Sequence, residues 1–491
     1  MFNFNELEIV HPNEPNCPRG SFVGIRKDKY LGKMAFTLPK GFDNFEKSYD
    51  NVKKLFFLMY RTFEKFRQSH EQIDEKLNSK DNTQINNHQG AYTFTDEDNN
   101  ETILYSKIDL IERIFKTYQE LEIESLIQEL GLVEEVDYSR IENYLDKGIY
   151  LNNNVIFIEN MQGYRNIVRG VPSELIELFC YIYKELANEL EQELSEPIKE
   201  IAFNFSYKYL NAEQSLFSEH SFESTIGILK DCLDNIHKTT AYKNHQYWDI
   251  YEAVEHFLYG SLKFDDEINQ GFWGINNFSY IWEEMCNYTI LQYEDVKIFY
   301  CDRNTKLELP ILRPNLNQDR YIWIDKNWDN VFNIQLHGFK RWIRPDIIFE
   351  KIQPENSEVT PTKQLVKNRK DSINQYQNLI RKIINPYSKS LNIVGNVDSI
   401  YLVDWKYYSS DLFFGNYREE NERVNYSIIK QLTYEYCLSQ ITKKKISNQF
   451  CIPYYDEKDK EQFILDRNQL DCEIELVKIN FALVQENYLH G

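Results

Sequence analysis

The fold is decided by the stretch DSIYLVDWKYY, residues 398–408, in which Asp404 and Lys406 follow a continuous apolar run. Such a run is typical of a strand buried on both faces. Residues two apart in a strand point to the same face, so Asp404 and Lys406 share one face and Trp405 points to the other. An unpaired buried carboxylate is costly, so the sequence predicts a partner for Asp404.

A second acidic residue, Asp346, lies in the apolar stretch IRPDIIFE, residues 343–350. Two carboxylates and a lysine on neighbouring strands are explained if a divalent cation sits between them. Mg²⁺ prefers oxygen ligands, lowers the pKa of a bound water and polarises phosphate, and Mn²⁺ is an alternative. The pattern therefore predicts phosphodiester cleavage, with Asp346 and Asp404 as metal ligands. Lys406 would position or deprotonate the attacking water, or stabilise the charge that develops on the phosphate.

Two flanking helices offer supporting residues. Glu283, in YIWEEM, would add a third carboxylate to the metal site, and its neighbour Glu284 is an open alternative. Gln431 would orient the lysine or the water, with Lys430 beside it as a candidate DNA contact. The expected order of this part is helix, strand, strand, strand, helix, strand, over residues 277–291, 295–301, 343–350, 398–408, 424–441 and 448–455.

These motifs resemble those of the PD-(D/E)XK nucleases, and within them the McrC-like restriction subunits. In those proteins a Glu-bearing helix precedes an Arg-Pro-Asp strand, an Asp-x-Lys-Tyr strand and a helix with a Gln and a nearby Tyr. The corresponding residues here are Trp282–Glu283, Arg344–Asp346, Asp404–Tyr407, Gln431–Tyr434 and Cys451–Pro453. The N-terminal segments FVGI (22–25) and LPKGF (38–42) further resemble LlaJI-type restriction endonuclease subunits.

The resemblance implies an α/β fold with a mixed-sheet PD-(D/E)XK core at the C-terminus, and cleavage of double-stranded DNA in a prokaryotic defence system. It also implies a McrB-like AAA+ GTPase partner, and this chain has no P-loop motif of its own. Two alternatives stay open: a stand-alone nuclease in repair or abortive infection, and a non-catalytic adaptor that regulates the motor. The residues leave DNA and RNA undistinguished as substrates.

Charge divides the chain into two regions. The net charge is −21, but residues 271–491 hold 28 basic and 30 acidic residues, whereas residues 1–270 hold 28 and 47. The polar segment FDDEINQG, 264–271, is the expected boundary. We expect residues 1–270 to form an α-rich, acidic region that docks the motor, with a small β element in 19–42 and a strand in 152–161. Its helices are expected over 45–78, 103–130, 173–198, 222–238 and 246–261, with a loop over 78–100.

The remaining signals concern DNA contacts and cellular location. Lys363, Lys367, Arg369 and Lys370, in a polar insertion, are candidate DNA contacts, whereas Lys443–Lys445 are better explained as cations at a helix C-terminus. The eight cysteines form no Cys-x-x-Cys pair, which indicates reduced thiols of a cytoplasmic protein and no structural zinc site. Neither a signal peptide nor a membrane span is expected.

Overall fold

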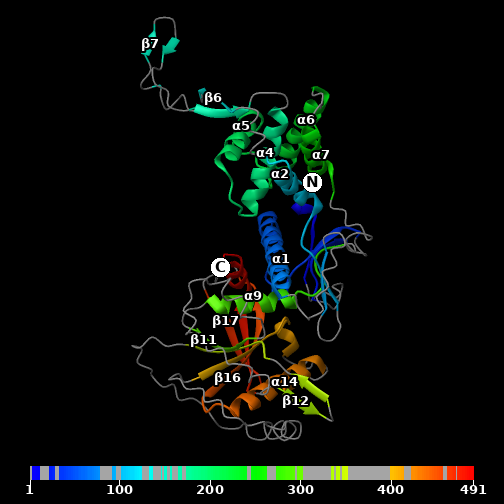
Figure 1. Ribbon diagram of the computed structural model, residues 1–491, viewed down its shortest axis with the longest axis vertical. Helices are drawn as coiled ribbons and strands as arrows, with labels where there is room; N and C mark the ends of the chain where they lie inside the picture. Colours follow the sequence, from blue (N-terminus) through cyan, green and yellow to red (C-terminus); the bar gives the residue numbers. More distant parts are fainter. Residues whose placement is uncertain are drawn as a thin grey trace.

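The α/β fold of the computed structural model contains two six-stranded mixed sheets and a group of helices (Figure 1). In this view the helical group lies at the top, the first sheet and the long helix α1 in the middle, and the second sheet at the bottom. The structure describes residues 3–11, 21–27, 32–77, 91–95, 101–123, 132–136, 145, 149–151, 155–157, 164–168, 173–239, 245–261, 272–292, 296–301, 333–336, 339–342, 345–351, 399–413, 422–456, 462–470 and 473–490.

The first sheet has the strand order β1-β3-β2-β10-β5-β4. Its strands are β1 (Glu8–Val10), β2 (Val23–Lys27), β3 (Met34–Thr37), β4 (Ala91–Thr95), β5 (Glu101–Tyr105) and β10 (Phe272–Ile275). Only the β1–β3 pair is parallel among the described pairs of this sheet. Helix α1 (Tyr49–Leu77) packs on the sheet through Phe56 and Phe63, whose rings lie 5.1 and 5.2 Å from that of Trp273.

The β element expected in 19–42 and the helix expected over 45–78 are confirmed as β2, β3 and α1. The prediction of a helix starting at residue 103 was wrong, and so was that of a loop throughout 78–100. Residues 101–105 form β5 and residues 91–95 form β4, while the helix α2 (Asp109–Glu120) begins later. The physical reason is that β5 lies between β4 and β10, where Ile103, Leu104 and Tyr105 are all buried.

The helical group consists of α2, α4 (Ser173–Glu189), α5 (Glu196–Tyr209), α6 (Phe222–Thr239) and α7 (His245–Tyr259). A short helix η1 (Phe4–Glu6) and two antiparallel strand pairs belong to the same half of the chain. The pairs are β6 (Leu132–Val136) with β9 (Tyr164–Val168), and β7 (Ile149–Leu151) with β8 (Val155–Phe157). The helix expected over 173–198 is two helices. Pro197 lies in the first turn of α5, where a missing N–H costs nothing, so it begins a helix instead of ending one.

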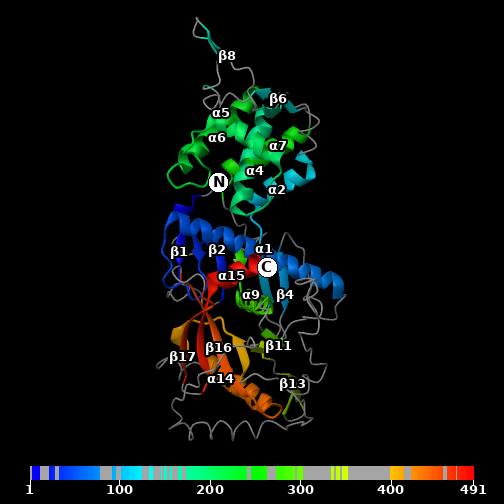
Figure 2. The same ribbon diagram turned by 90° about the vertical axis from the view of Figure 1, so that its left-hand side faces the viewer.

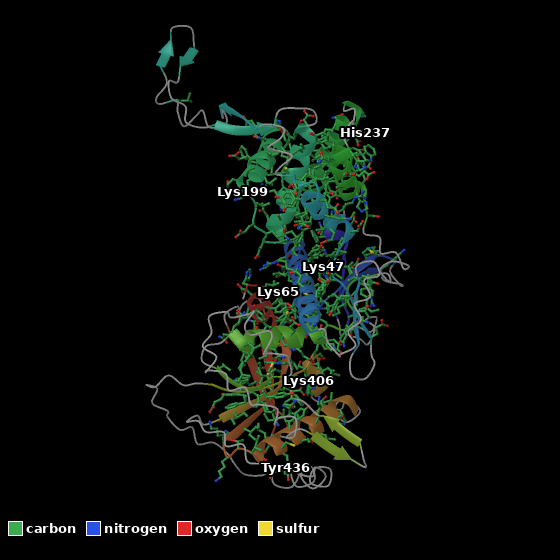
Figure 3. The ribbon with its side chains drawn as sticks, in the orientation of Figure 1. Lys47, Lys65, Lys199, His237, Lys406 and Tyr436 are labelled. Carbon is green, nitrogen blue, oxygen red and sulfur yellow. The ribbon has the colours of Figure 1, made fainter. Side chains whose placement is uncertain are left out.

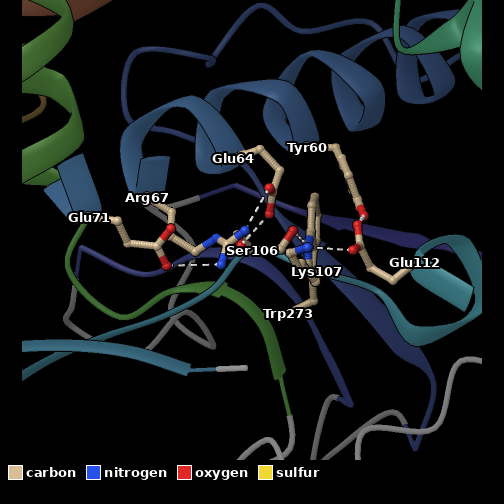
Figure 4. A network of polar contacts seen from close by, with 8 residues as sticks. All are labelled: Tyr60, Glu64, Arg67, Glu71, Ser106, Lys107, Glu112 and Trp273. Atoms are coloured by element: carbon tan, nitrogen blue, oxygen red, sulfur yellow. Dashed lines mark hydrogen bonds and ion pairs between the residues drawn. The ribbon is translucent and has the colours of Figure 1, made fainter. Parts of the chain in front are cut away.

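A polar network ties α1 to the connection between β5 and α2 (Figure 4). Arg67 bonds Glu64 at 3.1 Å, and the Ser106 hydroxyl donates to Glu64 at 2.6 Å. The indole of Trp273 donates to the Ser106 carbonyl at 2.9 Å. The network therefore joins α1, the end of β5 and β10, which lie far apart in the sequence.

The second sheet has the order β11-β14-β15-β16-β18-β17. Its strands are β11 (Val296–Cys301), β14 (Ile347–Lys351), β15 (Ser399–Trp405), β16 (Lys445–Tyr454), β17 (Ile464–Gln469) and β18 (Glu475–Asn480), and its helices are α9 (Ser279–Gln292), α14 (Glu422–Ser439) and α15 (Phe481–His490). A hairpin of β12 (Asn333–Leu336) and β13 (Phe339–Trp342) and a turn η4 (Ser410–Phe413) complete the described part. The expected helix, strand, strand, strand, helix and strand are found as α9, β11, β14, β15, α14 and β16, but the β12–β13 hairpin between β11 and β14 was not predicted.

The second sheet is covered on both faces. Leu402 packs in one cluster with Tyr434 and Leu438 of α14, while Val403 and Trp405 belong to the core that includes α9 and α15. That larger core is continuous with the first sheet and α1. β10, which follows the expected boundary at 270, pairs with β2 and β5, so this strand belongs to the first sheet. Within the described residues, no helix is long and apolar enough to cross a membrane.

Candidate active site

Two aspartates meet at one edge of the second sheet. Asp404 lies near the end of β15, and Asp346 immediately precedes β14. These strands are antiparallel with Ile347 opposite Val403, so the two aspartates fall opposite each other. Each carboxyl group shifts the pKa of the other, and Asp346 Oδ2 accepts the backbone N–H of Trp405 at 2.6 Å. Strand pairing thus joins the two acidic residues that the sequence singled out.

Lys406 lies on the same side of the strand as Asp404. Its Nζ is 2.7 Å from Asp404 Oδ2 and 5.6 Å from the ring centroid of Phe450, and its backbone N–H donates to the Cys451 carbonyl at 2.8 Å. Figure 3 shows Lys406 in the lower part of the molecule, between α9 and α14. Trp405 points to the other face, where its indole donates to Asn287 Oδ1 at 2.7 Å. The predicted alternation of the strand is confirmed.

The buried charges shift the pKa values of the two aspartates in opposite directions. Burial, followed by the charges of Asp404 and Glu283, raises the pKa of Asp346 well above its usual value. Burial alone would raise the pKa of Asp404, but the Lys406 charge, the hydrogen bond with Asp346 and the Lys430 charge outweigh it and lower that pKa. Burial lowers the pKa of Lys406, but the charges of the two aspartates outweigh it, so the pKa is raised. Lys406 is therefore a cation paired with the Asp404 carboxylate.

The donor set of this pair suits a small hard cation. Mg²⁺ takes oxygen ligands, commonly one or two carboxylates, and keeps several waters. The neighbouring negative charges raise the pKa of the buried Asp346. A bound divalent cation would relieve this repulsion between carboxylates. In the described residues no group of three or more His, Cys, Asp and Glu side chains is arranged to hold a metal ion. Asp346 and Asp404 could hold Mg²⁺ or Mn²⁺ together with water.

The two neighbouring glutamates of α9 have different surroundings. Glu283 is half-buried, and its charge contributes to the raised pKa of Asp346, so the two carboxyl groups lie within electrostatic range of each other. Glu284 is 5% exposed and accepts the Tyr488 hydroxyl at 2.6 Å, and its other oxygen lies 2.8 Å from His70 Nε2. Glu284 thus links α9 to α15 and α1, and the choice that the sequence left open favours Glu283 for the site.

Gln431 is fully buried between α14 and the sheet. Its amide nitrogen donates to Asn448 Oδ1 at 2.7 Å and to the carbonyls of Gln449 and Leu402 at 3.3 and 3.4 Å. These bonds join α14 to β15 and β16, so Gln431 fixes the helix to the strand that carries Asp404. Lys430 beside it reaches the site electrostatically, because its charge lowers the pKa of Asp404.

Only some of the lysines and arginines considered as DNA contacts lie in the described part of the chain. Lys363, Lys367, Arg369 and Lys370, like Arg344 of the family motif, lie outside the described residues. Lys444 forms an ion pair with the buried Glu350 of β14, a structural partner that the sequence did not predict. Lys443 and Lys445 are exposed.

The N-terminal segment Leu38–Phe42 contributes to this edge of the sheet, which sequence reasoning missed. The backbone N–H of Lys40 donates to the Tyr407 hydroxyl at 2.9 Å, and its Nζ donates to the Tyr407 carbonyl at 3.1 Å. In the sequence, the motif LPKGF indicated only a resemblance to LlaJI-type subunits. Its long-range partner, directly after Lys406, leaves no periodic signal in the sequence.

Comparisons of the chain with family models, curated proteins and solved structures find no match.

Proposed function

We propose that this protein is a Mg²⁺-dependent endonuclease that cuts the DNA backbone with a PD-(D/E)XK core in its second sheet. The observation that carries the proposal is the meeting of Asp346, Asp404 and Lys406 at one sheet edge, with 2.7 Å between Lys406 Nζ and Asp404 Oδ2. The order in which α9, the sheet strands β11, β14 and β15, α14 and β16 follow one another is consistent with such a core.

The residues of the site divide the chemistry between them. Asp346 and Asp404 would hold Mg²⁺, with Glu283 as a further acidic group beside them. The bound ion supplies an activated water and a polarised phosphate. Because Lys406 is held as a cation by the aspartates, it is suited to stabilising the negative charge that develops on the phosphate, and poorly suited to removing a proton.

We further propose that the nuclease acts in the cytoplasm with a McrB-like AAA+ GTPase in defence against foreign double-stranded DNA. The charge distribution supports a partner, since residues 271–491 have a net charge of −2 and hold few excess cations for the DNA backbone. The acidic residues 1–270 would dock this motor and stimulate its GTP hydrolysis.

The test mixes the purified chain with Mg²⁺ and plasmid DNA, alone and with the neighbouring gene product plus GTP. Lys406→Ala is expected to lower the cleavage rate about 100-fold or more, because a preorganised charge at the transition state is lost. Lys443→Ala, which removes an exposed lysine of the same half, serves as the matched control and should cut like the wild type.

Each outcome separates one candidate function from the others. Cleavage only in the full mixture, lost in Lys406→Ala, supports the motor-coupled nuclease. Cleavage by the chain alone, also lost in that variant, keeps the chemistry and removes the motor from it. Cleavage that persists in Lys406→Ala would place the active site elsewhere. A full mixture that never cuts DNA but shows stimulated GTP hydrolysis would favour the adaptor.

A further inference from the structure

The outer face of α5 carries two exposed aromatic side chains. Phe203 is 46% exposed and Tyr207 is 52% exposed, and their rings stack with centroids 6.3 Å apart. Residues four apart in a helix are neighbours on the same face, so the two rings form one ridge. The other face of α5 is buried through Ile198, Ile201 and Phe205, which belong to the apolar core.

Phe203 has no polar reason to be exposed. Among the large exposed hydrophobic residues that the structure describes, it alone has no polar group in its side chain. Trp248 and Tyr259, exposed aromatics of α7, donate hydrogen bonds to Glu252 and Asp234 at 2.9 Å. A Phe ring that is nearly half in water leaves apolar surface that burial would stabilise. An exposed aromatic pair of this kind is typical of a protein contact site.

The helices around this ridge carry a strong net negative charge. Residues 173–239, which include α4, α5 and α6, hold 13 acidic and 5 basic residues. The two lysines of α5 are already paired, Lys199 with Glu196 and Lys208 with Glu177, each at 2.7 Å. A surface of this charge repels DNA and a second copy of itself, whereas it attracts a basic protein.

The ridge lies at the opposite end of the molecule from the candidate active site. Figure 1 and Figure 2 both place α5 in the upper helical group and the strands of the second sheet in the lower part. Lys406 lies in that lower part as well (Figure 3). A protein bound to α5 would therefore leave the sheet edge with Asp346 and Asp404 accessible to DNA.

We propose that the Phe203–Tyr207 ridge docks the motor subunit by inserting both rings into an apolar cleft that is rimmed by lysine and arginine side chains. This inference rests on the proposed motor-coupled function and deepens it, because it names the docking surface and the chemistry of the contact. The two rings supply the apolar burial, and the acidic helices around them attract the basic partner.

The experiment measures binding of the full chain to the purified neighbouring gene product by titration calorimetry, with stimulation of GTP hydrolysis as a second readout. Phe203→Ala and Tyr207→Ala are each expected to weaken binding about tenfold or more, because an aromatic anchor of the interface is removed. The concentration of this chain that gives half-maximal stimulation should rise by a similar factor. Higher salt should weaken binding of the wild type, since opposite charges attract the two proteins.

Two further variants separate docking from structure. Tyr207→Phe keeps the ring and should bind like the wild type. Tyr426→Ala removes an exposed tyrosine of α14, in the other half of the chain, and is the matched control for the loss of a ring. Substitutions of exposed helical residues should leave the melting temperature unchanged. Weaker binding that occurs only together with a lowered melting temperature would show a structural role and overturn the proposal.

Three outcomes separate failure of this inference from failure of the proposed function. If the wild type, Phe203→Ala and Tyr207→Ala bind the motor equally well, the ridge is not the docking surface and the motor-coupled function stands. If the wild type sediments as a dimer that Phe203→Ala converts to a monomer, the ridge is a contact between copies and the proposal is wrong. If the wild type cuts DNA but never binds the motor, the docking fails together with the motor, and the nuclease chemistry stands.

Discussion

Glu283 and Glu284 are adjacent in the sequence but differ in what each contacts. Glu283→Gln is expected to slow cleavage at least about tenfold with little change in stability, because a half-buried acidic group beside Asp346 loses its charge. Glu284→Ala is expected to lower the free energy of unfolding by about 1–3 kcal/mol, since Tyr488 and His70 lose their buried acceptor. Urea unfolding and a plasmid-cleavage assay measure the two effects.

The reverse result would assign the catalytic role to Glu284: normal cleavage by Glu283→Gln, together with inactivity of a fully stable Glu284→Ala. Wild-type protein measured in parallel is the reference for both the cleavage rate and the free energy of unfolding. A conservative Glu284→Gln variant, which keeps an acceptor oxygen for Tyr488, should recover part of the lost stability.

Residue-level prediction from sequence works where the relevant geometry is local. Asp404 and Lys406 share a face because side chains alternate along a strand, and the apolar run around them made the strand recognisable. The distinction between Glu283 and Glu284 depends on Tyr488 and His70, which are distant in sequence. Lys40 was missed for the same reason, because its contact with Tyr407 joins two residues that are 367 positions apart in the sequence.

At the scale of elements, two glycines set the pairing of β2 and β10. Gly24 and Gly274 face each other with φ of +142° and +129°, and a Cβ on Gly24 would lie 2.1 Å from the Trp273 carbonyl oxygen. Gly24→Ala is expected to lower the free energy of unfolding by roughly 2–4 kcal/mol, because backbone must move to admit the methyl group. Urea denaturation followed by circular dichroism measures the change.

Gly227→Ala is the matched control for this prediction. Gly227 lies in α6, and no atom approaches the position of an added Cβ within 4 Å. Alanine is the better helix former, so this variant should be as stable as the wild type or more stable by up to about 1 kcal/mol. Equal stability of Gly24→Ala and the wild type would mean that the two strands do not approach as closely as described.

The second sheet was predicted in part: β11, β14, β15 and β16 were expected, whereas β17, β18 and the helix α15 were not. β14, β15 and β16 are long or apolar enough to be recognised, whereas β4, β5 and β10 are short and join segments scattered over the chain. β10 in particular has four residues and gains its place only from pairing with β2 and β5. Local patterns carry no information about such partners.

At the scale of the whole molecule, one apolar core joins the regions before and after residue 270. Phe42 packs against Phe481 with ring centroids 4.9 Å apart, and the Gln485 amide of α15 donates to the Thr62 hydroxyl of α1 at 3.0 Å. Both polar groups are buried, so separation would expose apolar surface and leave hydrogen bonds unmade. The division at residue 270 is therefore a hypothesis about function. A folding experiment can test whether the two regions are also separate structural units.

Residues 271–491 expressed alone are expected to lack a cooperative unfolding transition and to bind a hydrophobic dye, because α9 and α15 lose their cover by α1 and β10 loses both of its partners. Near-ultraviolet circular dichroism, urea titration and dye fluorescence measure this, with the full chain as the control. A fragment that unfolds cooperatively at the midpoint of the full chain would contradict the prediction and show that residues 271–491 form an independent domain. If the prediction holds, loss of cleavage after deleting the N-terminal half reports on folding, and only point substitutions in the full chain can separate motor docking from stability.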